Sequence, residues 1–319
     1  MFHSADHYGV NFTVGQAGVD VFFVISGLIM WTITEKPAAP SGFLFDRVIR
    51  IVPMYWLATM VFVVGGLFHV FSHLILTVPY VIASLFFVPW PSPEYGMIWP
   101  VLVPGWTLNY EMVFYLLIAL AQLLPRRLQL PALLAVLASA VGLGVWLQPT
   151  QYVAKFYTQP IILEFGVGLA FGALRGAGRL PGRVVSALLI VLGIAAYAGQ
   201  TILHLNGERL FYYGLPAAVL VLGVIGLERS GVPFRFEPLK YAGDGSYSIY
   251  LFHTFALILI LKLLPSHIGA WAMLPVAAAA AGVSLGAYQW IERPLVNRLR
   301  SLRKPQAKTA PQAAEAGAV

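Results

Sequence analysis

Two arginines three residues apart, Arg47 and Arg50, are the first side chains in this sequence that could bind a charged ligand. They lie in the segment FDRVIRIVPMY, where a new apolar stretch begins. On a helix, residues at i and i+3 share one face, with Cβ atoms about 5–6 Å apart. Two guanidinium groups at this spacing form a fork suited to phosphate groups held at a membrane surface. The spacing alone leaves open the alternative that both are ordinary cationic anchors.

Three carboxylates interrupt apolar stretches, where an ionisable group is costly and often functional. Glu111 in GWTLNYEMVFYL must be hydrogen-bonded, paired or protonated, and it is a candidate for chemistry or for a structural bond between helices. Glu164 in IILEFGVGLAFG has fewer polar neighbours, so we expect a structural role. Glu292 and Arg293 in WIERPL are expected to pair at a cytoplasmic helix end.

Histidine and tyrosine side chains supply the other candidates. Tyr247, Tyr250 and His253 in GDGSYSIYLFHTF fall close to one face at helical spacing. That face predicts a polar lining inside an apolar helix, with an interfacial aromatic belt as the alternative. His3 could take a proton from a hydroxyl near neutral pH, or could be an ordinary loop histidine.

Composition indicates a membrane protein. Of the 319 residues, 59% are hydrophobic and only 10% are charged, against about 25% in globular domains. The net charge of +7 sits in short loops between apolar stretches, which favours the positive-inside rule over a nucleic-acid partner. Cysteine is absent, and no HExxH or GxxxxGK motif occurs, so we expect neither a metal site nor a phosphate loop.

Ten apolar stretches are predicted to be helical. They are Val19–Thr34, Ile51–Phe71, Leu74–Val88, Trp106–Leu124, Pro131–Leu147, Pro160–Leu174, Val184–Leu203, Phe211–Leu227, Ser246–Leu264 and Gly269–Trp290. If Ile51–Val88 crosses the membrane once, all but three of the 20 lysines and arginines lie on the cytoplasmic side. The exceptions are Lys155 and Arg209, predicted to lie outside, and Lys262, predicted to lie near an outer helix end.

The predicted fold is therefore an all-α, polytopic transmembrane helical bundle with nine crossings in this sequence. Residues 1–18 look like a loop that follows a helix, so a first span is expected to be missing or truncated, which would make ten. We expect one transmembrane domain over residues 1–300. Residues 301–319 form a basic, Ala/Pro/Gln-rich tail that we expect to be cytoplasmic and disordered.

Five motifs in order carry a family resemblance. They are GVDVFFVISGLIM, FDRVIRIVPMYW, PGWTLNYEMVFY, GDGSYSIYLFH and WIERPL. Together they resemble the membrane-bound acyltransferase family 3, and in particular its exopolysaccharide-production acetyltransferase branch, over roughly residues 1–300. The resemblance implies a ten-helix bundle that moves an acyl group, usually acetyl from acetyl-CoA, onto a saccharide hydroxyl.

The same resemblance implies roles for individual residues. MFHSADHYG matches the end of the family's arginine–histidine motif, whose arginine would precede Met1 and is absent from this sequence. The implied catalytic residues are His3 and Glu111, the implied contacts to the coenzyme A phosphates are Arg47 and Arg50, and the implied substrate-binding residues are Tyr247, Tyr250 and His253.

These expectations define an O-acetyltransferase of the bacterial inner membrane. Its donor substrate would be acetyl-CoA, with no metal. Its acceptor would be an exopolysaccharide or a lipid-linked saccharide. Its other expected partners are the lipid bilayer and the polysaccharide-synthesis machinery. One alternative is a transporter or flippase for a glycan or lipid intermediate, without acyl transfer. A second alternative keeps the acyl chemistry but changes the acceptor, for example to a macrolide or to peptidoglycan.

Overall fold

The computed structural model describes residues 14–36, 39–70, 74–203, 207–232, 236–264 and 273–302, and its regular elements within these ranges are helices. In chain order they are α2 (Val14–Ile33), α3 (Pro40–Leu67), α4 (Val78–Leu85), the 3-10 turn η1 (Val103–Gly105), α5 (Trp106–Ala121), α6 (Arg126–Leu147), α7 (Tyr152–Tyr157), α8 (Ile162–Gly176), α9 (Arg183–Leu203), the π-helical turn η2 (Leu210–Gly214), α10 (Leu215–Arg229), α11 (Glu237–Asp244), α12 (Ser246–Leu263), α13 (Met273–Ala287), the π-helical turn η4 (Tyr288–Glu292) and α14 (Arg293–Ser301). The predicted tail lies outside the described residues after Leu302 and remains a prediction.

Seven helical segments within the described ranges are long and apolar enough to cross a membrane. They are Pro40–Leu67, Arg126–Leu147, Tyr152–Gly176, Arg183–Gln200, Leu210–Arg229, Ser246–Leu263 and Leu274–Ser301, and Ala17–Ile33 is a shorter apolar helix. The all-α, multi-pass membrane fold predicted from the sequence is confirmed. Of the two helices after residue 40, α3 has 28 residues and a length of about 42 Å, whereas α4 has eight and a length of about 12 Å. Only α3 of this pair can therefore cross a hydrocarbon core of about 30 Å.

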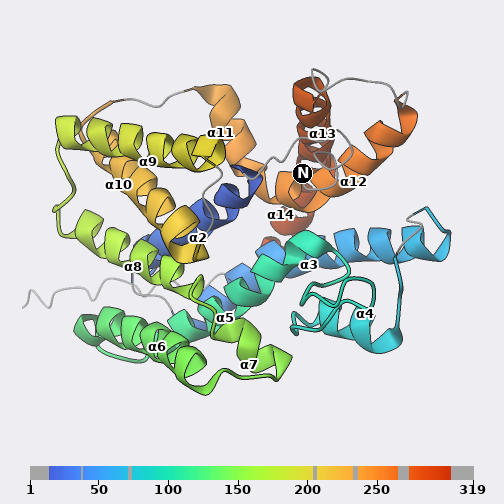
Figure 1. Cartoon of the computed structure of the whole chain (residues 1–319), viewed down its shortest axis with the longest axis horizontal. Coiled ribbons are helices and arrows are strands. Elements are labelled where there is room, and N and C mark those ends of the chain that lie inside the picture. The colour runs from blue at the N-terminus through green and yellow to red at the C-terminus, as the bar shows by residue number, and fades with distance from the viewer. Residues whose placement is uncertain are drawn as a thin grey trace, which may run out of the picture.

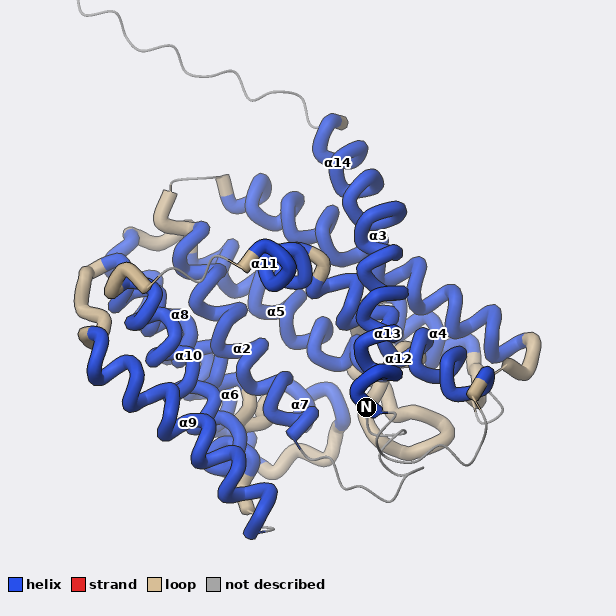
Figure 2. Tube along the Cα trace, turned by 90° about the horizontal axis from the view of Figure 1, so that it is seen from above, coloured by secondary structure: helices blue, strands red, loops and turns tan. Residues whose placement is uncertain are grey.

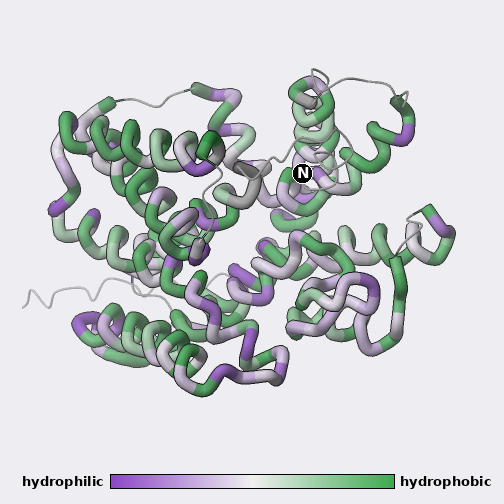
Figure 3. The backbone as a smooth tube through the Cα atoms, viewed as in Figure 1, coloured by the Kyte–Doolittle hydropathy of each residue, from purple (hydrophilic) through white to green (hydrophobic). Residues whose placement is uncertain are grey.

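Three helix pairs form most of the bundle: α2 packs along α8, α9 along α10, and α12 along α13 (Figures 1 and 2). The first two pairs are linked, because α10 also contacts α2 and α8, whereas α6 packs on α8 from the other side. Helix α3 contacts both α5 and α12, and in this way it links the α12–α13 pair to the rest of the bundle. Apolar residues dominate the helices, and polar residues concentrate at their ends and in the loops (Figure 3).

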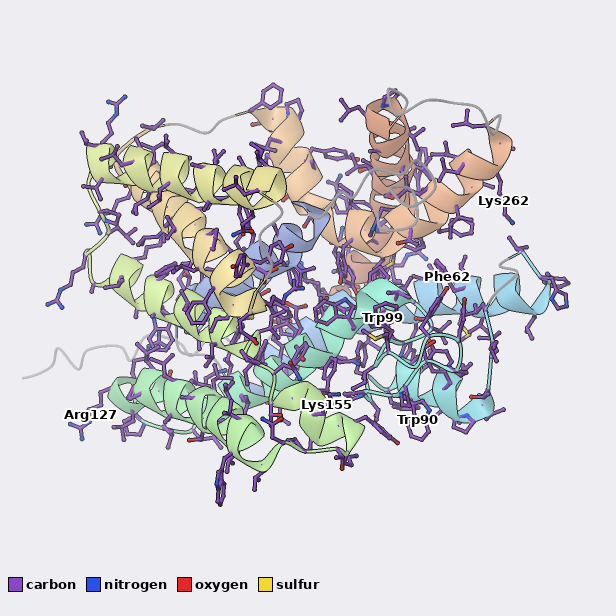
Figure 4. The ribbon with its side chains drawn as sticks, in the orientation of Figure 1. Phe62, Trp90, Trp99, Arg127, Lys155 and Lys262 are labelled. Carbon is purple, nitrogen blue, oxygen red and sulfur yellow. The ribbon has the colours of Figure 1, made fainter. Side chains whose placement is uncertain are left out.

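Basic side chains gather where several helices end. The Arg126 guanidinium at the start of α6 lies 3.6 Å from the ring centre of Trp31, near the end of α2. Arg175 at the end of α8 pairs with Glu228 at the end of α10, with 3.5 Å between Nη2 and Oε2. Arg127 and Lys262 project from opposite sides of the molecule (Figure 4). This grouping agrees with the predicted cytoplasmic cluster, although the orientation in a membrane remains a prediction.

Helices α2 and α8 touch backbone to backbone at a pair of glycines. A Cβ atom on Gly27 would lie 2.1 Å from the carbonyl oxygen of Phe165, and one on Gly168 would lie 2.0 Å from that of Val24. Gly172, one turn further along α8, packs against the Trp31 side chain. Small residues at four-residue spacing allow such close contact between membrane helices. The GxxxG face of α8 is therefore a packing surface.

A buried ion pair links the first half of α2 to η2. Arg209 donates from Nε to Asp20 Oδ1 at 3.1 Å and from Nη2 to Oδ2 at 2.6 Å, and Asp20 is fully buried. Glu164 is 1% exposed, interacts with Asp20 and packs against Gly214, and neither carboxylate oxygen has a hydrogen-bond partner among the described residues. The charge count predicts that Arg209 lies on the outer side of the membrane, and the structure shows that Asp20 is its partner. This ion pair was not predicted from the sequence.

Gly27→Ala should destabilise the bundle, because its methyl group would force α2 and α8 apart. We expect a loss of about 2–3 kcal/mol in unfolding free energy, seen as a lower melting temperature of the detergent-purified protein. The matched control is Gly142→Ala in α6, where an added Cβ meets nothing within 4 Å. That variant should be unchanged or more stable by about 0.5–1 kcal/mol, since alanine favours helix. Equal melting temperatures for the two variants would contradict this packing.

Asp20→Asn should also destabilise, because it leaves the Arg209 guanidinium without its carboxylate. We expect a loss of about 3 kcal/mol, at the low end for a buried pair because 34% of the Arg209 side chain is exposed. Adding Arg209→Gln should cost less than the two single losses combined. Glu228→Gln, which removes the exposed pair with Arg175, is the control and should cost under about 1 kcal/mol. A simple sum in the double variant would argue against coupling between Asp20 and Arg209.

Candidate functional site

Glu111 is the centre of the candidate site. It lies on the second turn of α5, is 5% exposed, and accepts a 2.9 Å hydrogen bond from Ser26 Oγ of α2 to Oε1. Arg47 and Arg50 of α3 act on its carboxyl group electrostatically, and Tyr115 lies one turn further along α5. Three helices therefore converge on a carboxylate that apolar residues otherwise enclose.

Arg47 and Arg50 lie on α3 as predicted and are close enough to repel each other. The Nε atom of Arg47 is buried and has no hydrogen-bond partner among the described residues. Arg50 is exposed and acts electrostatically on Glu111 and on Glu292 of η4. Two like charges with an unused donor favour an added anion at this place.

A pocket of about 220 Å³ opens beside Arg47. Its lining comes from the end of α2, the first turns of α3 and the end of α5, and comprises Ile33, Thr34, Gly42, Phe43, Asp46, Arg47 and Gln122. The amide nitrogen of Gln122 is buried without a hydrogen-bond partner, like the Nε atom of Arg47. Both residues line this cavity, and a ligand carrying acceptor oxygens would satisfy the two donors if the side chains turned toward it.

Tyr247 and Tyr250 fasten α12 to the neighbouring helices. Tyr247 donates a 2.7 Å hydrogen bond from Oη to the carbonyl of Ile51 in α3. Tyr250 Oη lies 2.6 Å from Thr107 Oγ1 and donates to the carbonyl of Pro104, just before α5. Both phenols act electrostatically on Glu111, so the structure brings them to the candidate site. In this structure both hydroxyls are engaged between helices, and their predicted contact with substrate remains a prediction.

The two predicted histidines stand apart from this group. His253 Nδ1 faces the carbonyls of Ile249 and Tyr250 in its own helix at 3.0 and 2.8 Å. Its Nε2 lies 3.4 Å from Thr254 Oγ1, and no contact described for it reaches Glu111. His3 lies outside the described residues. The roles predicted for both histidines remain predictions.

Glu292 differs from the expectation that it pairs with Arg293. It is 5% exposed and accepts a 2.6 Å hydrogen bond from Ser248 Oγ of α12, whereas exposed Arg293 donates to Gln289. Pro294 does not interrupt a helix, because it lies in the first turn of α14, which follows η4 and continues to Ser301. A π-helical turn rotates the following side chains, which a regular helical period cannot predict.

Ser26 and Gln122 were also missed as site residues. Ser26 occurs in an apolar stretch, where a serine commonly bonds to its own helix, and only the fold shows that it faces Glu111. Gln122 follows α5 as its C-cap and looks like an ordinary polar boundary residue. No group of three or more His, Cys, Asp or Glu in the described ranges is arranged to hold a metal ion. The arrangement is suited to binding an anionic ligand at a mouth that leads to a buried carboxylate.

Comparison with known proteins identifies the family of this chain. Residues 1–290 match the acyltransferase-domain model Acyl_transf_3. The chain is 44% identical over 319 residues to the exopolysaccharide production protein ExoZ of Rhizobium meliloti (strain 1021), covering 99% of this chain and 100% of that protein. It is 27% identical over 345 residues to the acyltransferase MdmB of Streptomyces mycarofaciens, covering 95% of this chain and 86% of that protein.

No solved structure matches this chain. The family model covers most of the sequence, including four of the five motifs that predicted the resemblance and the first residue of the fifth, WIERPL, and the ExoZ match covers nearly all of it. The chain therefore belongs to the Acyl_transf_3 family of acyltransferases and is a multi-pass membrane acyltransferase.

Proposed function

We propose that the chain is an O-acetyltransferase of the bacterial inner membrane, which moves acetyl from acetyl-CoA to a hydroxyl of an exopolysaccharide or of its lipid-linked precursor. The observation that carries the proposal is the electrostatic convergence of Arg47, Arg50 and Glu111, together with a pocket beside Arg47 where α2 and α5 end and α3 begins. An acyl thioester of coenzyme A carries phosphates at one end and a thioester carbonyl at the other. The site would bind the phosphates at its mouth and hold the carbonyl deeper in the bundle.

The charge arrangement supports an acyl donor with several phosphates. Arg47 and Arg50 repel each other, Asp46 and Glu111 attract Arg47 electrostatically, and no carboxylate is in salt-bridge contact with either arginine among the described residues. Each charge-assisted hydrogen bond to a phosphate contributes about 1.5–3 kcal/mol. Glu111, by contrast, is held by Ser26 inside the bundle, where a negative charge would repel phosphate but could orient a histidine or a sugar hydroxyl.

In the proposed reaction the acceptor hydroxyl attacks the thioester carbonyl. A C–O bond forms, the C–S bond breaks, and the proton of the hydroxyl passes through a base to the leaving thiolate, which gives free coenzyme A. The family motif supports His3 as that base, with Glu111 orienting it or the sugar. In a second route His3 carries the acetyl group itself before it passes to the acceptor.

The acceptor class rests on the relatives. ExoZ is named for exopolysaccharide production, and MdmB is named as an acyltransferase. We assign the saccharide acceptor from the ExoZ match, which is the stronger of the two. Tyr247, Tyr250 and His253 are the proposed acceptor-side residues, and polysaccharide-synthesis enzymes are the proposed partners. A saccharide acceptor linked to a lipid would reach the site through the bilayer.

Replacing the arginines tests the donor site. Arg47→Gln and Arg50→Gln should each weaken acetyl-CoA binding about tenfold or more, and the double variant should lose detectable binding and acetyl transfer. The measurement is transfer from labelled acetyl-CoA in membrane vesicles, together with donor titration of the purified protein. The control is Arg127→Gln, an exposed arginine at the start of α6 that does not line the pocket.

Two outcomes would reject the donor site. Unchanged donor affinity in the double variant would remove the arginines from it. Transport of a glycan without consumption of acetyl-CoA would favour the transporter alternative instead.

Replacing His3 tests the base. His3→Ala should lower acetyl transfer at least a hundredfold, because the acceptor hydroxyl loses its proton acceptor, while acetyl-CoA affinity stays the same. Steady-state transfer and donor titration on the same preparation separate these effects. His253→Ala is the matched histidine control and should chiefly affect saturation by the acceptor. Full activity in His3→Ala would exclude His3 as the base and as an acetyl carrier.

A further inference from the structure

Gln122 lines the pocket beside Arg47 and has a hydrogen-bond donor without a partner among the described residues. Its amide nitrogen is buried and has no partner among the described residues, and the same holds for the Nε atom of Arg47. Leaving a buried donor unpaired costs free energy, so native proteins seldom keep one without a reason. Both residues line one pocket of about 220 Å³, where a ligand with acceptor oxygens would give these donors a partner once the side chains turn toward it.

A second buried glutamine provides a contrast. The amide nitrogen of Gln129 donates to the carbonyl of Leu124 at 3.0 Å, and its oxygen accepts from Arg126 at 2.8 Å. Gln129 is thus fully used in joining α6 to the end of α5. Gln122 stands seven residues earlier on the α5 side of the same junction, yet no such bond holds its nitrogen. The difference separates an amide that stabilises the fold from one that is available to a ligand.

The position of Gln122 relative to Glu111 limits what the ligand can be. The two residues are separated by eleven positions along α5 and its C-cap, which corresponds to about 16 Å along the helix axis. A pantetheine arm has a chain of about a dozen atoms, equivalent to four extended residues or about 14 Å. A donor whose phosphate lies at Gln122 could therefore bring its thioester close to the depth of Glu111.

We infer that Gln122 is a further donor-binding residue, whose amide donates to an oxygen of the phosphate–pantetheine part of the acyl donor next to Arg47. The inference rests on the proposed acyl-CoA site and assigns one part of the donor to the pocket. The adenosine part then extends outward past the ends of α2 and α3. Thr34 and Asp46 also line the pocket, and the carboxylate of Asp46 would disfavour a phosphate placed directly against it.

Gln122→Leu and the isosteric Gln122→Glu test this role in the full-length protein. Both should weaken binding of acetyl-CoA about tenfold, and by a similar factor binding of acetyl-dephospho-CoA and of acetyl-phosphopantetheine, because all three share the contacted part. Without donor, the melting temperature of Gln122→Leu should be unchanged or higher, since an unpaired buried donor is removed. The rise in melting temperature on adding donor should shrink in proportion to the lost affinity.

Gln129→Leu is the matched control. It should lower the melting temperature without donor and leave donor affinity unchanged, because its amide bonds lie within the protein. If Gln122→Leu behaved like this control, Gln122 would be a structural residue and the inference would fail. If the effect of Gln122→Leu vanished with acetyl-phosphopantetheine, the contact would lie on the adenosine part, and the placement would be wrong.

The arginine variants separate this inference from the proposed function. Loss of donor binding in Arg47→Gln with normal binding in Gln122→Leu would overturn only the role of Gln122. Normal binding and turnover in all of these variants would overturn the donor site itself.

Discussion

Burying a carboxylate in an apolar helix bundle is the constraint on which the rest of this structure depends. Asp20, Glu111, Glu164 and Glu292 are each at most 5% exposed. Asp20 accepts hydrogen bonds from Arg209 at η2, Glu111 from Ser26 on α2 and Glu292 from Ser248 on α12, whereas Glu164 has no such donor among the described residues. A carboxylate left without such a donor would be protonated or would destabilise the fold. Each bond therefore also fixes the relative position of two elements. Because α2 supplies both Asp20 and Ser26, it links the outer ion pair to the candidate site.

The helical architecture could be predicted because its causes are local. Apolar stretches of span length and short basic loops identify membrane helices without any tertiary information. Gly168 and Gly172 at four-residue spacing are likewise visible in the sequence as a face for close helix packing, but only the fold shows that α2 is the partner helix. The places of Arg47, Arg50 and Glu111 could be predicted as well, because charges inside apolar stretches are rare and each had to be near a partner or a ligand.

The unpredicted features depend on contacts between residues far apart in the sequence. Ser26 and Glu111 are separated by 85 positions, and Arg209 and Asp20 by 189. Neither Ser26 nor Gln122 is unusual in its own segment, so only the packing of α2, α3 and α5 shows that they face the site. The role of Glu292 was hidden for another reason. Glu292 was expected to pair with Arg293 because the two opposite charges are adjacent in the sequence, and only the fold shows that Glu292 faces Ser248 of α12 instead.

The contact between Gly27 and Gly168 has a consequence for how the molecule can move. Helices that touch through their backbones cannot slide or rotate against each other without collision, so α2 and α8 behave as one rigid body. Ser26 and the carboxylate that it holds belong to the fixed side of the candidate site. On the opposite side, α12 is held to α3 and to the start of α5 by the hydroxyls of Tyr247 and Tyr250. Hydrogen bonds can be exchanged, whereas a steric contact cannot, so α12 is the side of the candidate site that can be displaced at the lower cost.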